Sequence, residues 1–479
     1  DLKHDVVWPH LGQRGDPAHR VLVDDEVLAQ PLGRLQFQFA RQRSDLRRAQ
    51  QRSLLRTLQG IGDMAAFAHV RLGAPCAAFK TLALARAVGS DLAFRLASGK
   101  REGGAVPNAE PFQRWQSLQV AIERQLRESL DQAGKAQPVQ TEKLEELRGA
   151  YQDLMARLKA SGALEQERIE LSAFAKNLSP ESVAALVFAS EQGGGILLVT
   201  PDAKSSAPSA VIELPHMTSG RLETLLNGDG QQNGGWLAAY ERYRKQSSSY
   251  DEAHVEQAVT AWNTQIETLL PELWDLVMGP LAAWLSARAP NVQEVHLMVP
   301  GLMSVLPLHA ARPSHDDAAY FAARWAVSYL PSPRALMQVR MPTMGREASL
   351  LAVTDPAGDI GADINPAWPF FSDSRRRNVR GRVPEVAAAL ASAGDVSHLS
   401  FFCHGIWEGS DPDLSHLVMA DGSELSAQEL AAIDLRSVDL ALLGACETAL
   451  IGTRLAPDEF TGLPVSLLQA GVRSVAASQ

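Results

Sequence analysis

The sequence predicts an α/β fold in which a mostly parallel sheet, flanked by helices, follows an amino-terminal helical region. Two short apolar runs, 399–402 and 440–443, have the length and composition of strands that are buried on both faces of a parallel sheet. Upstream, residues 144–158 carry leucine and tyrosine at alternating steps of three and four, which is the seam of an amphipathic helix. The pattern therefore changes from helical to strand-rich along the chain.

The composition provides a large hydrophobic core and argues against a disulfide framework. At 479 residues, of which 46% are hydrophobic, the chain is long enough for two to three domains, and it contains only three cysteines. No apolar run approaches the roughly 20 residues that a membrane helix needs, and the first residues lack a secretory pattern. A net charge of -10 gives no general attraction to nucleic acid. We therefore expect a cytoplasmic protein with no membrane partner and no direct nucleic-acid partner.

A histidine and a cysteine follow the two apolar runs. His404 comes shortly after the first run, and Cys446 comes shortly after the second. Because ligands of open α/β sheets bind beyond the carboxyl ends of the strands, the two side chains would meet if the runs are neighbouring strands. A free thiol, with a pKa of about 8.5, is mostly protonated at neutral pH. An imidazole that accepts the thiol proton turns the sulfur into a nucleophile. The spacing favours a Cys-His hydrolase.

Backbone groups beside these side chains fit the same chemistry. Gly405 lacks a Cβ, so a substrate backbone can approach it closely. The amides of Gly405 and Cys446 are candidates for an oxyanion hole, which stabilises the charge that forms when the thiolate attacks a peptide carbonyl. The neighbouring Cys403 is expected to face the core, because adjacent strand residues point to opposite faces.

An alternative use of these residues is a zinc site built from Cys403, His404, His416 and Cys446. Adjacent cysteine and histidine ligands have poor geometry, and the sequence has no paired CxxC spacing. We therefore expect no metal and no cofactor.

The ordered segments of the carboxy-terminal part resemble the CHAT family of caspase-like cysteine peptidases, which belong to clan CD, are related to separases and are commonly attached to tetratricopeptide repeats. The His-Gly and Gly-Ala-Cys-Glu-Thr motifs carry the resemblance, together with leading segments and with a helix and strand after the cysteine. The supporting segments are 295–301, 306–310, 326–332, 350–356 and 462–475. The resemblance implies that His404 is the catalytic histidine and that Cys446 is the nucleophile.

The resemblance also implies a domain organisation. An α-helical, tetratricopeptide-like region is expected over 1–177, a noncatalytic lobe over 178–340 and the catalytic caspase-like lobe over 341–479. The family continues past the strand near Ala476 with a Trp-containing motif and further helices. We therefore expect the catalytic lobe to be incomplete where this sequence ends.

The noncatalytic lobe is expected to begin with a hairpin. Apolar runs at 184–189 and 196–200 flank a glycine-rich turn, and a third strand is predicted at 210–214. Pro271 is suited to the first turn of a helix over 272–285.

The amino-terminal helices are repeat-like, since no clean 34-residue period is visible. A second seam over 115–126 and a break at 134–138 predict an antiparallel hairpin with the helix of 144–158. The small-residue pattern over 77–96 resembles the last units of a tetratricopeptide array. Stacked helix pairs form concave surfaces, so we expect this region to bind a protein or ligand activator.

The family points to a regulated activity. Its bacterial members often belong to defence or programmed-death systems, in which a partner bound to the helical region releases the site to cleave one effector protein. The resemblance therefore implies a regulated cysteine endopeptidase with a specific protein substrate. The alternative is a catalytically inactive CHAT-fold scaffold that binds protein partners through its helices.

Acidic residues near the expected site are candidates for holding a basic substrate residue. Asp355 ends the first strand of the expected catalytic sheet, and Asp458 and Glu459 follow the cysteine. Asp355 is equally suited to a turn before Pro356, so its two roles stay open.

A dense basic segment contains Arg375, Arg376, Arg377, Arg380 and Arg382. The stretch 355–385 is short and polar, so we expect it to contain no further strand and the arginines to lie on a loop. Such a charge run is commonly a solvated loop. The more specific interpretation is an exposed processing or regulatory loop, and a third is a nucleic-acid contact whose binding would depend on salt.

Overall fold

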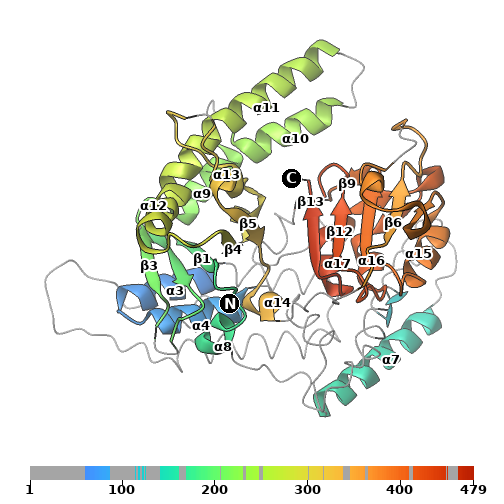
Figure 1. The fold of residues 1–479 in the computed structure, drawn as a ribbon, viewed down its shortest axis with the longest axis horizontal. Helices are drawn as coiled ribbons and strands as arrows, with labels where there is room; N and C mark the ends of the chain where they lie inside the picture. The colour runs from blue at the N-terminus through green and yellow to red at the C-terminus, as the bar shows by residue number, and fades with distance from the viewer. Residues whose placement is uncertain are drawn as a thin grey trace, which may run out of the picture.

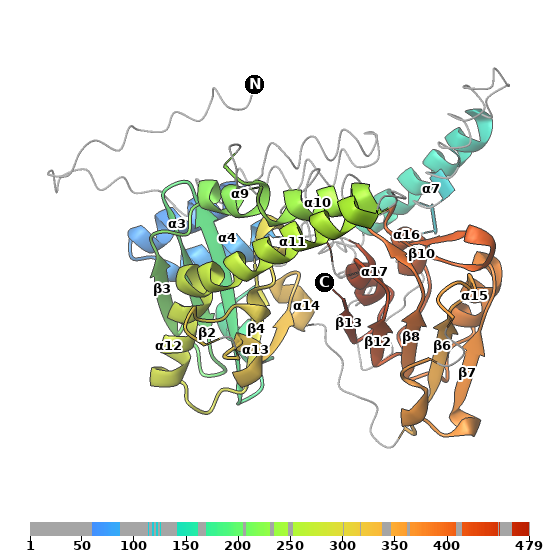
Figure 2. The same cartoon turned by 90° about the horizontal axis from the view of Figure 1, so that it is seen from above.

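The structure is a computed structural model, and the residues that it describes form two lobes side by side, each built around a five-stranded sheet (Figures 1 and 2). The described residues are 60–86, 141–160, 169–204, 207–229, 234–247, 252–299, 301–316, 318–337, 346–361, 365–408, 414–448, 450 and 462–478, with isolated positions between 114 and 125. Among them, no helix is both long and apolar enough to cross a membrane. The α/β fold with parallel-rich sheets flanked by helices is confirmed.

The first lobe contains a mixed sheet with the strand order β3-β2-β1-β4-β5. Its strands are β1 (Ser182–Ser190), β2 (Gly193–Val199), β3 (Ala210–Leu214), β4 (Glu294–Met298) and β5 (Ala326–Tyr329). β1 and β2 form the predicted antiparallel hairpin, and β3 lies where the third strand was expected. β4 and β5 join in parallel, so each extends the sheet through a crossover connection.

Both faces of this sheet are covered, because alternate residues of β1 enter two different cores. Val183, Ala185 and Val187 belong to one cluster, while Leu186 and Phe188 belong to the other. This alternation follows from the two-residue period of a strand and explains why the whole of β1 is buried.

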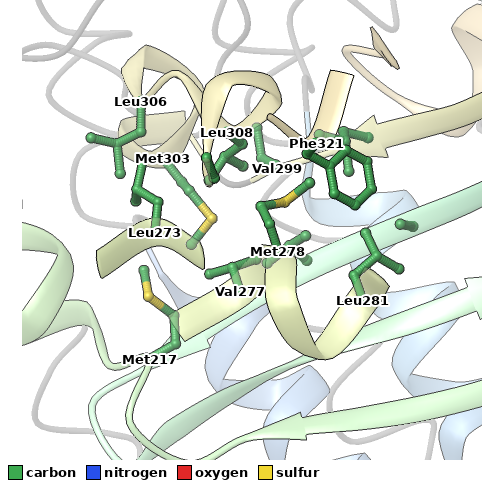
Figure 3. Packing of buried hydrophobic residues seen from close by; sticks show 14 of the residues in the cluster. Met217, Leu273, Val277, Met278, Leu281, Val299, Met303, Leu306, Leu308 and Phe321 are labelled. Carbon is green, nitrogen blue, oxygen red and sulfur yellow. The ribbon is translucent and has the colours of Figure 1, made fainter. Parts of the chain in front are cut away.

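The larger core lies under helices on one face. These elements are α9 (Ser219–Asn227), α10 (Trp236–Ser247), α11 (Glu252–Leu273), the π-helical turn η1 (Trp274–Met278), α12 (Gly279–Arg288), the 3-10 turns η2 (Gly301–Val305) and η3 (Leu308–Ala310), and α13 (Phe321–Arg324). Figure 3 shows methionines and aliphatic side chains from these helices and from the chain after β4 filling one continuous cluster.

The prediction that a helix begins at Pro271 is wrong. The proline lies inside α11, and the π-helical turn follows directly. A proline removes one helical hydrogen bond, yet the apolar face formed by Leu270 and Leu273 continues into the core and keeps the chain helical.

The opposite face is covered by α3 (Ile61–Arg71), α4 (Pro75–Ala85), α8 (Leu171–Ala175) and α14 (Pro333–Met337). Phe79 of α4 stacks obliquely on Phe174 of α8, with ring centroids 5.6 Å apart. Part of the region expected over 1–177 therefore shares a core with the sheet of the first lobe, and the tetratricopeptide-like arrangement stays a prediction.

The amphipathic helix predicted over 144–158 is confirmed. It is α7 (Thr141–Ala160), and Tyr151, Leu154 and Leu158 are buried along its seam. Most of its expected hairpin partner, over 115–126, lies outside the described residues.

The second lobe contains a fully parallel sheet with the order β13-β12-β8-β6-β7. Its strands are β6 (Leu350–Thr354), β7 (Arg376–Val379), β8 (His398–Phe402), β12 (Leu440–Leu443) and β13 (Ser474–Ala477). The prediction that the two apolar runs are neighbouring strands is confirmed, since β8 pairs directly with β12. The chain order reverses between β6 and β8, which marks the topological switch point where open α/β sheets bind ligands.

One strand of this five-stranded sheet was not predicted. Residues 376–379 form β7 at the edge of the sheet, beside β6, although they are polar and basic. An edge strand is not fully buried, so its side chains need not be apolar.

Helices and short elements complete this lobe. They are α15 (Val383–Ala391), α16 (Ala427–Ala431), α17 (Leu463–Gln469), the 3-10 turns η4 (Trp368–Phe370), η5 (Asp373–Arg375) and η7 (Ala420–Gly422), and a small antiparallel sheet of β9 (Gly405–Ile406), β10 (His416–Val418) and β11 (Glu424–Ser426). The three helices pack on one face of the sheet, where they share a core with β6, β8 and β12.

Candidate active site

His404 and Cys446 follow the carboxyl ends of two paired strands at equivalent positions. Phe401 of β8 pairs with Leu443 of β12, and each candidate side chain comes three residues later. The Gly444 amide donates to the Phe401 carbonyl over 2.8 Å, which extends the pairing beyond the strands. The sheet thus brings the two residues to one edge.

The loops that carry these side chains are in contact through Gly405. A Cβ placed on Gly405 would lie 2.6 Å from the Cys446 carbonyl oxygen and 2.9 Å from the Thr448 Cγ2. Only a glycine fits this approach. The sequence predicted that a substrate backbone would approach Gly405. In the structure the backbone of the cysteine loop occupies this space. The oxyanion role of the Gly405 and Cys446 amides stays a prediction.

The two sulfur atoms near the site have different environments. Cys446 is a free, exposed cysteine, while Cys403 is buried in the core beside β8. Burial raises the pKa of the Cys403 thiol to about 12, which keeps it protonated and unreactive at neutral pH. The prediction that Cys403 belongs to the core is confirmed.

An aspartate that the sequence analysis missed lies beside the histidine. The Nε2 of His404 is 3.0 Å from the Oδ1 of Asp359, and the two side chains are 47% and 59% exposed. Asp359 lies on the loop after β6, across the switch point from His404. An acceptor on Nε2 fixes the tautomer and leaves Nδ1 for another partner.

Asp355 builds the loop that presents Asp359. Its carboxylate accepts hydrogen bonds from the amides of residues 358, 359, 360 and 361 over 3.0 to 3.2 Å. The side chain is buried, and the backbone has a left-handed φ of 42°. The carboxylate is therefore engaged within the loop, in agreement with the turn-forming alternative and not with a direct contact to a basic substrate residue.

The loop after Cys446 is a tight turn with two defined supports. Thr448 is buried and its hydroxyl donates to the Ala445 carbonyl over 2.9 Å. Glu447 has a φ of 62°, and its Oε2 accepts the backbone N–H of Trp407 over 2.9 Å. Glu447 thereby links the cysteine loop to the histidine loop.

The arginine segment is not a free loop. Arg376 and Arg377 lie in β7, and the others flank it. Each guanidinium has a partner: Arg375 with Glu347, Arg376 with Asp373 and the Trp368 ring, Arg377 with Asp395, Arg380 with the Thr354 carbonyl, and Arg382 with Asp421. These contacts make the segment part of the sheet edge, which corrects the expectation of a loop, while Arg375, Arg377 and Arg382 remain exposed.

The remaining candidates fall in two groups. Asp458 and Glu459 lie outside the described residues. His416, which the alternative zinc site required, lies in β10, where its Nδ1 is 2.9 Å from the Leu414 carbonyl oxygen.

A family model for the CHAT domain matches residues 267–479. This part of the chain is similar to a CHAT domain. The match starts within α11, takes in β4 and β5 of the first sheet and all of the second sheet, and includes His404 and Cys446, so the resemblance to the caspase-like, protease-related family is confirmed. No curated protein matches the chain. The domain boundaries at 177 and 340 stay predictions.

Proposed function

We propose that this chain is a regulated cysteine endopeptidase of the CHAT type, which cleaves a specific partner protein in a bacterial cytoplasm, in a defence or programmed-death system. One observation carries the proposal: an exposed thiol and an exposed imidazole follow adjoining parallel strands, on loops that touch at Gly405. Asp359, on the loop across the neighbouring switch point, contacts the imidazole of His404.

The proposed reaction divides hydrolysis into two steps. His404 Nδ1 takes the proton of the Cys446 thiol, and the sulfur attacks the carbonyl carbon of the scissile peptide bond. His404 then gives this proton to the leaving amine, so the C–N bond breaks and a thioester remains. A water molecule, deprotonated by His404, attacks the thioester, and the products are a carboxylate and the free thiol.

Fixed groups around the pair support each step. The amides of Gly405 and Cys446 are the proposed donors to the oxyanion, whose charge appears only in the transition state. The Asp359 carboxylate accepts a hydrogen bond from the Nε2–H of His404 and stabilises the imidazolium that forms. The amino-terminal helices are the proposed site for a protein or ligand activator.

The proposal is tested with the proteins encoded next to this chain as candidate substrates. Wild type, Cys446→Ala and His404→Ala are incubated with each candidate, with and without the other neighbouring products as activators. We expect one pair of fragments that appears only with the wild type, and whose masses identify a single cut. Cys76→Ala, which changes a distant cysteine, should cleave like the wild type.

Absence of any Cys446-dependent fragment under all these conditions would contradict the peptidase. Wild type and Cys446→Ala would then bind the same partners equally, which is the behaviour of a catalytically inactive scaffold.

Asp359→Asn is expected to lower kcat/KM by up to about fivefold. The contact is partly exposed, and such pairs are worth about 0.2–1 kcal/mol, so the effect is modest beside the loss of either catalytic group. Asp395→Asn is the matched control, because it breaks an exposed aspartate contact of the same lobe far from His404. Equal values for the two variants, measured on the same substrate, would show that Asp359 does not act on the histidine.

A further inference from the structure

A helix of the noncatalytic lobe reaches the cysteine loop. The helix pair α10–α11 extends from the first sheet toward the second lobe in both views (Figures 1 and 2). Two side chains of α10, Tyr240 and Arg244, contact Glu447, which directly follows the candidate nucleophile. The catalytic loop is therefore held from outside its own lobe.

Both oxygens of the Glu447 carboxylate have donors. The Tyr240 hydroxyl donates to Oε1, and the Arg244 Nε is 2.9 Å from the same oxygen. Oε2 accepts the Trp407 amide. Glu447 is only 13% exposed, so the loss of these donors would leave a charge that water cannot fully solvate.

These contacts hold Glu447 in a strained backbone conformation. Its φ of 62° is left-handed, which is costly for a residue other than glycine. Hydrogen bonds to a charged group are among the stronger ones, and two of the three donors to Glu447 come from α10. The helix therefore stabilises the conformation next to Cys446.

The histidine loop is fixed by the same helix. Trp407 lies three residues after His404, is buried, and belongs to the core of the noncatalytic lobe. Arg244 donates to the Trp407 carbonyl over 3.2 Å, and its guanidinium lies 5.9 Å from the centre of the indole ring. Arg244 consequently contacts both loops that carry the catalytic pair.

Tyr240 is itself rigidly held. Its ring packs against Trp262 of α11 with centroids 5.0 Å apart and stacks on Trp236 at 6.2 Å. Burial and the Glu447 carboxylate raise the pKa of the Tyr240 phenol, and the charge of Arg244 opposes part of this rise. The hydroxyl therefore stays a donor to Glu447.

We infer that Tyr240 and Arg244 are positioning residues, which act through Glu447 to hold the Cys446 loop against the His404 loop. The helix pair α10–α11 thereby sets the reactivity of Cys446. This inference rests on the proposed function and names positioning residues of that same site.

The test measures the thiol without a substrate. Wild type, Arg244→Gln, Glu447→Gln and Tyr240→Phe are alkylated with iodoacetamide across a pH series, and the modification of Cys446 is followed by mass spectrometry. We expect Arg244→Gln and Glu447→Gln to react at least about tenfold more slowly at neutral pH, because the cysteine loop would no longer be held against the histidine loop. Tyr240→Phe should slow the reaction by less, and Arg244→Lys should restore part of the rate.

Controls separate positioning from loss of structure. Arg242→Gln changes an exposed arginine on the same helix and should react like the wild type. Cys76 in each sample reports general exposure. Variants that unfold at lower temperature but keep the wild-type alkylation rate would overturn the inference, since they would show a structural role only.

His404→Ala distinguishes the two proposals. If it slows alkylation and the Arg244 and Glu447 variants do not, the catalytic pair stands and the inference is overturned. If His404→Ala reacts like the wild type, the catalytic pair itself fails, and the inference fails with it.

Discussion

Gly405→Ala is expected to abolish peptidase activity and to destabilise the catalytic lobe by about 1–3 kcal/mol. The added methyl would lie 2.6 Å from the Cys446 carbonyl oxygen and 3.1 Å from the Ala445 Cβ, so the cysteine loop must move away. A displacement of about 1 Å in a reacting group costs about a hundredfold in rate. We therefore expect kcat to fall by at least this factor, measured on the substrate that Cys446 cleaves.

Gly394→Ala is the matched control for this prediction. Gly394 lies in the same lobe, has no atom within 4 Å of an added Cβ and has no left-handed φ. Alanine there should leave the rate unchanged and the stability equal or slightly higher, because it restricts the unfolded chain. Full activity of Gly405→Ala would show that the contact between the two loops is not needed for catalysis.

Most strands of the two five-stranded sheets could be predicted because their signal is local. A run such as 440–443, bounded by polar residues and glycine, indicates burial on two faces without knowledge of its neighbours. Because parallel strands end at one edge, the pairing of β8 with β12 brings the residues that follow them to the same edge. His404 and Cys446 could be placed together for the same reason.

The contacts that position His404 and Cys446 could not be predicted, because they join residues that are distant in sequence. Asp359 is 45 residues from His404, and Tyr240 is 207 residues from Glu447. Aspartate and tyrosine at these positions carry no periodic or spacing signal of their own. A weak hint was available for Glu447, since it directly follows the candidate nucleophile in the quoted motif.

The edge strand β7 escaped prediction for a different physical reason. Its residues, Arg376–Val379, bury little side-chain surface, so neither a two-residue alternation nor an apolar run marks them. Only pairing with β6 makes the segment a strand. Composition alone therefore indicated a loop where backbone hydrogen bonds decide the structure.

Arg86→Met is expected to destabilise the noncatalytic lobe by about 3–5 kcal/mol. Arg86, at the end of α4, and Asp63, in α3, form an ion pair of 3.1 Å whose side chains are 6% and 8% exposed. Arg86 also donates to the carbonyls of Met298 in β4, over 2.8 Å, and of Val187 in β1. Asp63 accepts the Ala189 amide over 2.9 Å, so the pair fastens both helices to the sheet.

The measurement is hydrogen exchange of peptides that cover β1, together with urea unfolding. The surface pair of Arg71 and Glu213 provides the control, since its 3.7 Å contact is 64% and 65% exposed and Arg71→Met should cost less than about 1 kcal/mol. Asp63→Leu alone should cost about as much as Arg86→Met, whereas the double variant should cost less than the sum, because it leaves no unpaired charge. Additive costs would show that the two charges do not stabilise each other.

The pH dependence of Arg86→Met gives an independent check on the same pair. Burial raises the pKa of the Asp63 carboxyl, and the charge of Arg86 opposes this rise. Without Arg86 the folded state binds the Asp63 proton more tightly than the unfolded state does, so this contribution to stability is present at low pH and is lost as the pH rises through the folded pKa. The stability difference between wild type and Arg86→Met should therefore shrink as the pH is lowered from neutrality. A difference that does not change with pH would mean that the variant loses hydrogen bonds to the sheet and not the partner of a buried charge.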